Sequence, residues 1–136
     1  TRSRMMRAVR QRGTRPELRV RRMIYELGAR YRVNARGLPG SPDLSNRSRG
    51  WALFVHGCFW HGHQNCRRTK GGRLGRVPVN NAQFWRDKLV ANRERDRRKA
   101  RASRQLGLRV LVVWECELRD EAKLYRKIRR FLDGST

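Results

Sequence analysis

The segment LGLRVLVVWEC, residues 106–116, limits the folds open to this chain more than any other stretch. It is a continuous apolar run in a chain of which 34% of the residues are charged. Such a run is typical of a strand buried on both faces of a sheet. The stretch WALFVHG, residues 51–57, is the most strand-like part of the N-terminal half. Together the two segments predict a central sheet that is covered on both sides.

Helical spacing and turn residues predict the elements around these strands. We expect helices at 14–27, 81–106 and 120–132, and short strands at 31–33 and 43–45. The order of helix, three strands, helix, strand and helix predicts an α/β sandwich with a mixed sheet. No repeat is visible, so residues 1–136 are predicted to form a single domain. Its basic N-terminal arm is 1–12, and 67–80 is a basic loop that we expect to be mobile.

Basic residues dominate the composition. Lysine and arginine number 35 against 11 aspartates and glutamates, which gives a formal net charge of +24. An excess of this size concerns the partners of a protein more than its fold. Arginine binds phosphate and guanine through two parallel hydrogen bonds, so a nucleic acid is the natural partner. A solvated surface in an arginine-rich genome would account for arginine over lysine but not for the excess.

The sequence also indicates a compartment. No stretch approaches the roughly 18 apolar residues of a membrane span. The N-terminal residues TRSRMMRAVR lack the hydrophobic segment of a secretory signal. Two of the three cysteines lie beside histidines, which favours a reducing compartment and a metal site over a disulfide. We therefore expect a cytoplasmic, nucleoid-associated protein without a membrane partner.

The stretch FVHGCFWHGHQNC, residues 54–66, holds all three histidines and two of the three cysteines. Structural zinc takes four cysteine or histidine ligands in a tetrahedron. The four side chains that could form this set are Cys58, His63, Cys66 and Cys116. A buried strand cysteine is the alternative for the last of them. The use of every cysteine in the chain favours a structural zinc that ties the loop to the end of the last strand.

Two histidines, His56 and His61, are left over once zinc has four ligands. An imidazole titrates near neutral pH and can transfer protons, but it can equally be structural or contact a phosphate. Asp43 gives the catalytic interpretation support, because its strand should pair with 51–57 and bring it close to His56. A carboxylate at the end of a sheet suits Mg²⁺. The alternative is an aspartate that starts a turn after proline.

Two further acidic residues are candidates for the same site. Glu17 lies on the first predicted helix and Asp96 lies in the RERDRR segment of the long helix. The alternatives are a helix cap for Glu17 and a surface ion pair for Asp96. Acidic residues are scarce in this chain, and each one on a surface that faces DNA must tolerate or use the repulsion of phosphate.

These residues resemble those of the very short patch repair (Vsr) endonucleases, which nick DNA at T:G mismatches. The matching stretches are TRSRMM, LPGSPD, FVHGCFWHGHQNC, FW..K with N.ERDRR, and GLRVLVVWECEL, in the order of the family and over nearly the whole chain. The combination of HGCFWH with a distant VWEC is highly specific. The resemblance implies a PD-(D/E)xK-type nuclease core, which has a mixed central sheet flanked by helices, with a structural zinc site.

The resemblance also implies roles for the candidate residues. Asp43 would bind the catalytic Mg²⁺ together with the main-chain carbonyl of Val55, and Glu17 would act through metal-bound water. Val55 stands where the best-known member of the family has threonine, a change that a main-chain ligand tolerates. His61 would transfer a proton at the scissile phosphate, and Asp96 would orient it.

His56 would assist at the phosphate. The family inserts a phenylalanine–tryptophan pair and a methionine of the N-terminal arm into the base stack, and these positions match Phe59, Trp60 and Met6. A mispaired step is cheaper to open than a paired one, so such a wedge can discriminate between them.

The sequence thus predicts a Mg²⁺-dependent, zinc-stabilised endonuclease that nicks one strand 5′ of the mispaired T at T:G mismatches and so initiates very short patch repair. Its partner would be double-stranded DNA that contains the mismatch. We expect the protein to be a monomer, with repair proteins as further partners. Two alternatives stay open, a Vsr-like nicking enzyme for a different lesion or site and a non-catalytic, zinc-stabilised DNA-binding module.

Overall fold

The computed structural model describes residues 15–58, 61, 63 and 81–134. The described elements are α2 (Arg15–Glu26), β1 (Arg32–Val33), β2 (Leu44–Asn46), β3 (Trp51–His56), α3 (Ala82–Gln105), β4 (Arg109–Trp114), a 3-10 helix (Glu115–Arg119) and α4 (Glu121–Leu132). The predicted order of helices and strands is confirmed. None of the described helices is long and apolar enough to cross a bilayer.

The four described strands form one mixed sheet in the order β1-β2-β3-β4. β2 pairs antiparallel with both β1 and β3, whereas β3 and β4 are parallel. Every residue of β3 is buried. β4 is mostly half-buried, because it lies at the edge of this sheet. The prediction of a mixed sheet is therefore confirmed, but burial of 106–116 on both faces is wrong.

The end of that segment also differs from the prediction. The strand stops at Trp114, and residues Glu115–Arg119 turn into the 3-10 helix. Cys116 thus lies two residues after the strand, within the 3-10 helix, rather than at the end of the strand. The side chain of Glu117 accepts a hydrogen bond from the main-chain N–H of Trp114 at 3.0 Å, which caps this turn.

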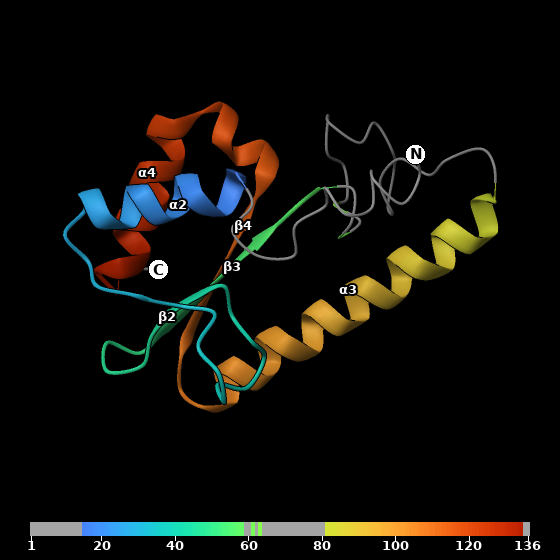
Figure 1. The fold of residues 1–136 in the computed structure, drawn as a ribbon, viewed down its shortest axis with the longest axis horizontal. Coiled ribbons are helices and arrows are strands. Elements are labelled where there is room, and N and C mark those ends of the chain that lie inside the picture. The colour runs from blue at the N-terminus through green and yellow to red at the C-terminus, as the bar shows by residue number, and fades with distance from the viewer. Residues whose placement is uncertain (1–14, 59–60, 62, 64–80, 135–136) are drawn as a thin grey trace.

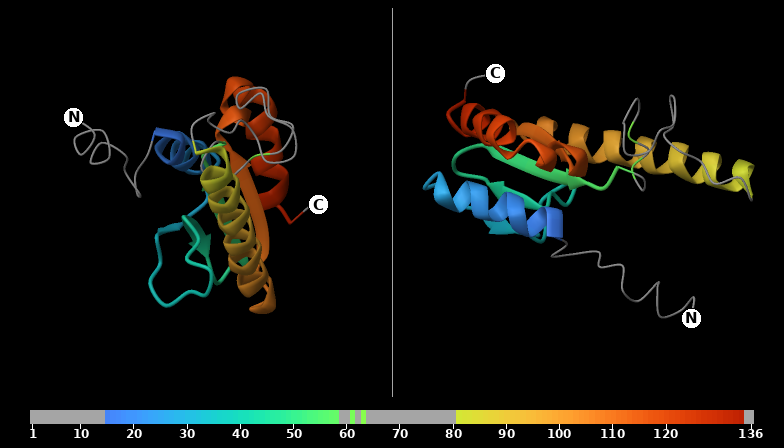
Figure 2. Two further views of the ribbon diagram at one scale, coloured as in Figure 1. Left: turned by 90° about the vertical axis from the view of Figure 1, so that its right-hand side faces the viewer. Right: turned by 90° about the horizontal axis from the view of Figure 1, so that it is seen from above.

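The two faces of the sheet are covered by different helices (Figure 1). On one face, α2 and α4 pack against alternate residues of β3, and the main core lies there. Its fully buried members include Val20, Leu53 and Ile128. α3 lies across the other face, and turning the molecule shows that α2 and α4 stay on the opposite side of the strands from it (Figure 2).

The long helix α3 is less buried than its apolar residues predict. Only Leu89, Ala100 and Ser103 are buried in it. The apolar side chains of Phe84 and Leu106 predict that both residues point inward, but Phe84 is 59% exposed. Figure 1 gives the reason, because the N-terminal part of α3 projects beyond the described sheet. Leu106 is likewise exposed, at the end of the helix.

The C-terminal half of α3 is fixed to the bend that precedes β2. The hydroxyl of Ser103, which is fully buried, donates to the main-chain oxygen of Pro39 at 3.1 Å. Gly40 has φ +88°, and a Cβ there would overlap the main-chain oxygen of Lys99. Only glycine therefore fits this close approach. The contact fixes the bend, and with it Asp43, relative to the helix that carries Asp96.

Candidate active site and metal centre

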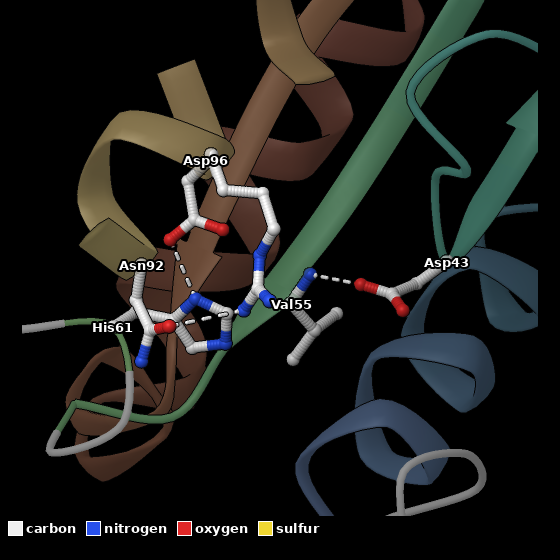
Figure 3. A network of polar contacts seen from close by, with 6 residues as sticks. Asp43, Val55, His61, Asn92 and Asp96 are labelled. Carbon is white, nitrogen blue, oxygen red and sulfur yellow. Dashed lines mark hydrogen bonds and ion pairs between the residues drawn. The ribbon is translucent and has the colours of Figure 1, made fainter. Parts of the chain in front are cut away.

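Asp43 stands immediately before β2 and reaches across to the neighbouring strand. The main-chain N–H of Val55 donates to Oδ2 of Asp43 at 2.7 Å (Figure 3). The predicted proximity of Asp43 to the end of the strand at 51–57 is therefore confirmed. Burial raises the pKa of Asp43 to about 6, although the bond from Val55 partly opposes the shift. A buried carboxylate with a raised pKa is a frequent feature of functional sites.

The carbonyl of Val55 points to the same side as its N–H. In a strand, one residue directs both groups toward the same neighbour. Leu44 pairs with Leu53, so the same register would place Pro42 opposite Val55. Proline has no N–H and cannot bond to that carbonyl. The oxygen of Val55 and the carboxylate of Asp43 are therefore directed toward a common region, as a pair of magnesium ligands would be.

Glu17 belongs to this region as well. It lies in the first turn of α2 and is only 5% exposed. Its negative charge is one of the causes that raise the pKa of Asp43. Its Oε2 atom lies 3.5 Å from Arg21, an i,i+4 contact along the helix. A buried glutamate that acts electrostatically on a second carboxylate is placed to support a cation site.

His61 and Asp96 form a close pair on the other side of Val55 (Figure 3). Nδ1 of His61 lies 2.6 Å from Oδ2 of Asp96. Burial on its own would raise the pKa of Asp96, but the hydrogen bond to His61 and nearby positive charges outweigh it and lower the pKa. An ionised Asp96 makes Nδ1 the donor, so Nε2 of His61 is left as a proton acceptor.

His56 is buried behind this pair. Its ring stacks on that of His61, with centroids 4.0 Å apart and planes at 5°. Burial lowers the pKa of His56 to about 3, and the charge of His61 acts in the same direction. His56 is therefore neutral at physiological pH. Its Nδ1 is buried without a hydrogen-bond partner among the described residues.

A second cluster lies next to the first. The ligand atoms of Cys58, His63 and Cys116 all lie within 4.8 Å of one another. Sγ of Cys116 is 3.6 Å from Nδ1 of His63. A zinc with ordinary bond lengths at the tetrahedral angle separates sulfur and nitrogen by about 3.5 Å, so this spacing fits the metal. The fourth predicted ligand, Cys66, lies outside the described residues.

Trp114 joins the two clusters and was not foreseen. Its ring stacks on His63 with centroids 4.0 Å apart and meets His56 edge-on at 5.1 Å. The tryptophan therefore lies between the candidate metal ligand His63 and the candidate catalytic residue His56, and it contacts both. Its place in VWEC, two residues before Cys116 and at the end of a strand, was the available signal.

Lys99 is a second residue that the sequence interpretation missed. Burial is the main cause of the pKa shifts of Asp43 and His56. The positive charge of Lys99 opposes the rise at Asp43 and adds to the fall at His56. Lys99 lies one turn after Asp96 and one turn before Ser103 along α3, so the three occupy one side of the helix. That spacing was the signal that could have found it.

Several predicted residues cannot be placed. Cys66, the wedge residues Phe59, Trp60 and Met6, the arm 1–12 and the loop 67–80 all lie outside the described residues. For the remaining candidates, the structure brings Asp43, Val55 and Glu17 together on one side of the end of β3. It brings His56, His61 and Asp96 together on the other side.

Comparison with known proteins identifies relatives over almost the whole chain. The model of the family described as DNA mismatch endonuclease Vsr matches residues 1–68. The type II nicking enzyme V.XorIIP of Xanthomonas oryzae pv. oryzae is 45% identical, over 96% of this chain and 91% of its own length. V.NmeAIP, a type II nicking enzyme of Neisseria meningitidis serogroup A, is 36% identical over 98% and 93% of the two chains.

A third relative carries the name of the family itself. The DNA mismatch endonuclease Vsr of Escherichia coli K12 is 42% identical, over 91% of this chain and 75% of its own. Similarity of this extent accompanies a mixed α/β fold and a cluster of acidic residues and histidines at one end of its sheet. The chain therefore belongs to the Vsr family of DNA endonucleases.

Proposed function

We propose that this protein is a Mg²⁺-dependent endonuclease that nicks one strand of DNA 5′ of the mispaired T at a T:G mismatch and so initiates very short patch repair. The observation that carries the proposal is the convergence, around the end of β3, of a buried carboxylate and a histidine–carboxylate pair. A binding module needs neither. The mixed sheet with Asp43 at the start of β2 also fits a PD-(D/E)xK-type nuclease core.

The residues present fit a magnesium ion. Asp43 and the carbonyl of Val55 would hold it, and Glu17 would accept hydrogen bonds from its water ligands. When bound, Mg²⁺ supplies Lewis-acid stabilisation of the charge that develops on the phosphate. The ordinary ligands of this ion are oxygens, and both proposed protein ligands are oxygens that face one region.

The His61–Asp96 pair would supply proton transfer. Nε2 of His61 accepts a proton from the attacking water, and Asp96 stabilises the imidazolium that results. Water adds to phosphorus, the bond from phosphorus to O3′ breaks, and O3′ takes up a proton from a solvent water molecule, so the products carry a 3′-hydroxyl and a 5′-phosphate. Neutral His56 supports the stacked ring of His61 from behind and offers a hydrogen bond to the phosphate without adding charge.

We also infer that Cys58, His63, Cys66 and Cys116 hold a structural zinc. The distance of 3.6 Å between Cys116 and His63 supports this set. Such a metal would tie the loop that carries His61 to the 3-10 helix after β4. His61 lies between two of the proposed ligands in the sequence, so the zinc would fix its main chain.

Mismatch specificity is supported by the 42% identity to the DNA mismatch endonuclease Vsr of Escherichia coli. The two other relatives are type II nicking enzymes and favour a second candidate, a nicking enzyme for a different site. The two candidates differ in the substrate and share the chemistry.

A substrate panel tests the proposal. Otherwise identical duplexes that carry T:G, U:G or a fully paired step are incubated with the protein, with and without added Mg²⁺. We expect a nick 5′ of the mispaired T only in the T:G duplex and only with Mg²⁺. Equal nicking of the paired duplex would favour the second candidate, and no nicking of the T:G duplex would refute the first.

A further inference from the structure

A cleft of about 850 Å³ lies between α3 and the side of β4 that carries Val112 and Trp114. Val112 and Trp114 of β4 line it, and so do His61 and Asp96. The cleft is therefore continuous with the proposed active site. Figure 1 shows that α3 and β4 run apart from the short turn that joins them.

Four arginines of α3 line the cleft: Arg93, Arg97, Arg101 and Arg104. They are spaced by four, four and three residues, which places them along one side of the helix. From the first to the last they span about 16 Å of the helix axis at a rise of about 1.5 Å per residue. One DNA strand advances about 3.4 Å per base step, so the row has the length of about five consecutive phosphates.

The charge of the cleft selects an anionic occupant. Among the described residues that line the cleft, Asp96 is the only acidic one, and it is paired with His61. Arg97 contacts Glu94 at 3.4 Å, but this pair is exposed and therefore weak.

We propose that this cleft binds the phosphate backbone of the duplex on one side of the nick, and that Arg97, Arg101 and Arg104 serve as its contacts there, while Arg93 lies on the other side of Asp96. The proposal rests on the proposed function, because it takes the part of the cleft next to His61 as the position of the scissile phosphate. From Asp96, the row extends toward Arg104 over about 12 Å, which corresponds to three or four base steps. Binding in the cleft should therefore depend on the length and charge of one flank of the duplex and should not depend on its base sequence.

The test compares two exposed arginines of the same helix. Arg101 lines the cleft, whereas Arg98 does not. Arg101→Ala and Arg98→Ala remove the same charge and replace arginine with an equally good helix former. The double variant Arg101→Ala/Arg104→Ala enlarges the effect. Arg98→Ala combined with Arg126→Ala on α4, also exposed, is its control.

Binding to the T:G duplex is measured as a function of salt, in full-length protein that carries Asp43→Asn to prevent nicking. Loss of two phosphate contacts should reduce the slope of log affinity against log salt by about 2. The control double variant should keep the parental slope. Equal slopes for the two double variants would overturn the proposal.

Flank truncation gives the second readout. The duplex is shortened to two base pairs beyond the nick, first on one side and then on the other. Shortening one of the two flanks should abolish the difference between the cleft variant and its control, and shortening the other should preserve it. A difference that survives both truncations would exclude a one-sided track. Parental protein is assayed for nicking in parallel, so that failure of the nuclease function and failure of the cleft are told apart.

Discussion

The two faces of the sheet differ in what their residues do. On the α2 and α4 face, Trp51, Leu53 and Val55 of β3 enter a continuous apolar core. The intervening residues of the same strand face α3, and the last of them is His56. Successive side chains of a strand point to opposite faces, so one six-residue strand serves both purposes. The comparison teaches that the main apolar core and the candidate catalytic histidines lie on opposite faces of a single sheet, and that Asp43 and Glu17 join them from the α2 side at the end of β3.

The division extends to the helices. α4 has a sharply apolar side with Leu124 and Ile128 fully or almost fully buried. α3 is twice as long, yet its described buried residues are only Leu89, Ala100 and Ser103. The polar surface that α3 keeps is what leaves room for the cleft and for the His61–Asp96 pair. Variants on the two faces should therefore fail in different ways.

Among the variants that compare the two faces, the largest expected effect is on the nicking rate, when Asp96 on the α3 face is changed. Asp96→Asn removes the charge that orients His61 and stabilises its imidazolium. Nicking should slow by about 10²–10⁴-fold, which is typical of a lost acid–base pair, while the melting temperature stays near the parental value. Asp87→Asn, at an exposed position on the same helix, is the matched control. Parental single-turnover rates for Asp96→Asn would remove this pair from the mechanism.

The candidate zinc ligands test whether a bound metal stabilises the fold near the active site. Cys116→Ser should weaken zinc affinity by more than about 100-fold, because even the loss of an outer partner of a ligand costs about 10–100-fold. Metal analysis should find one zinc per chain in the parental protein and less in the variant, with a lower melting temperature. A parental protein that is stable without metal would contradict the structural zinc.

The apolar face should respond in the opposite sense. Ile128→Ala opens a cavity in the main core, where Ile128 is 0% exposed. The free energy of unfolding should fall by about 2–5 kcal/mol, as read from urea denaturation. Nicking per folded molecule at low temperature should stay close to parental. A rate loss as large as that of Asp96→Asn would show that the two faces are not separable.

The smallest effect concerns the stability cost of the active site. The pKa of Asp43 is raised to about 6 in the folded chain from the model-peptide value of 3.8. The folded state then holds the proton more tightly, so stability is greatest below pH 4 and falls as pH rises to about 6. Without added Mg²⁺, Asp43→Asn should remove this fall and gain about 1–3 kcal/mol at pH 7. Urea denaturation at pH 4.5 and 7 measures this difference in the free energy of unfolding. A pH dependence that is the same in the variant and the parent would contradict a desolvated carboxylate at Asp43.

Local patterns in the sequence predict most of the fold. The apolar runs and the turn residues give each described strand to within a few residues, and the hairpin they imply places Asp43 against Val55. Burial is less predictable. Phe84 and Leu106 have core-like side chains but lie where α3 leaves the sheet or ends, which depends on the crossing of helix and sheet and on no local signal.

The site divides in the same manner. The approach of Asp43 to the end of β3 follows from strand pairing, whereas His61 and Asp96 are 35 positions apart and were joined through family resemblance. Lys99 and the arginine row depend on which side of α3 faces the sheet. The helix is charged all round, so its sequence has too weak an apolar stripe to define that side. Trp114 was taken as core because its strand was predicted to be buried.

The central claim is that this protein cuts DNA at the end of β3 through Asp43, and the most direct test separates cutting from binding in one variant. Nicking and affinity for the T:G duplex are measured for parental protein, for Asp43→Asn and for Asp133→Asn, an exposed control at the end of α4. We predict that Asp43→Asn abolishes nicking at any Mg²⁺ concentration, binds the duplex as tightly as the parent or more tightly, and melts no lower. The control should nick as the parent does. If Asp43→Asn nicks at the parental rate, Asp43 does not hold the catalytic metal and the account of this site is wrong.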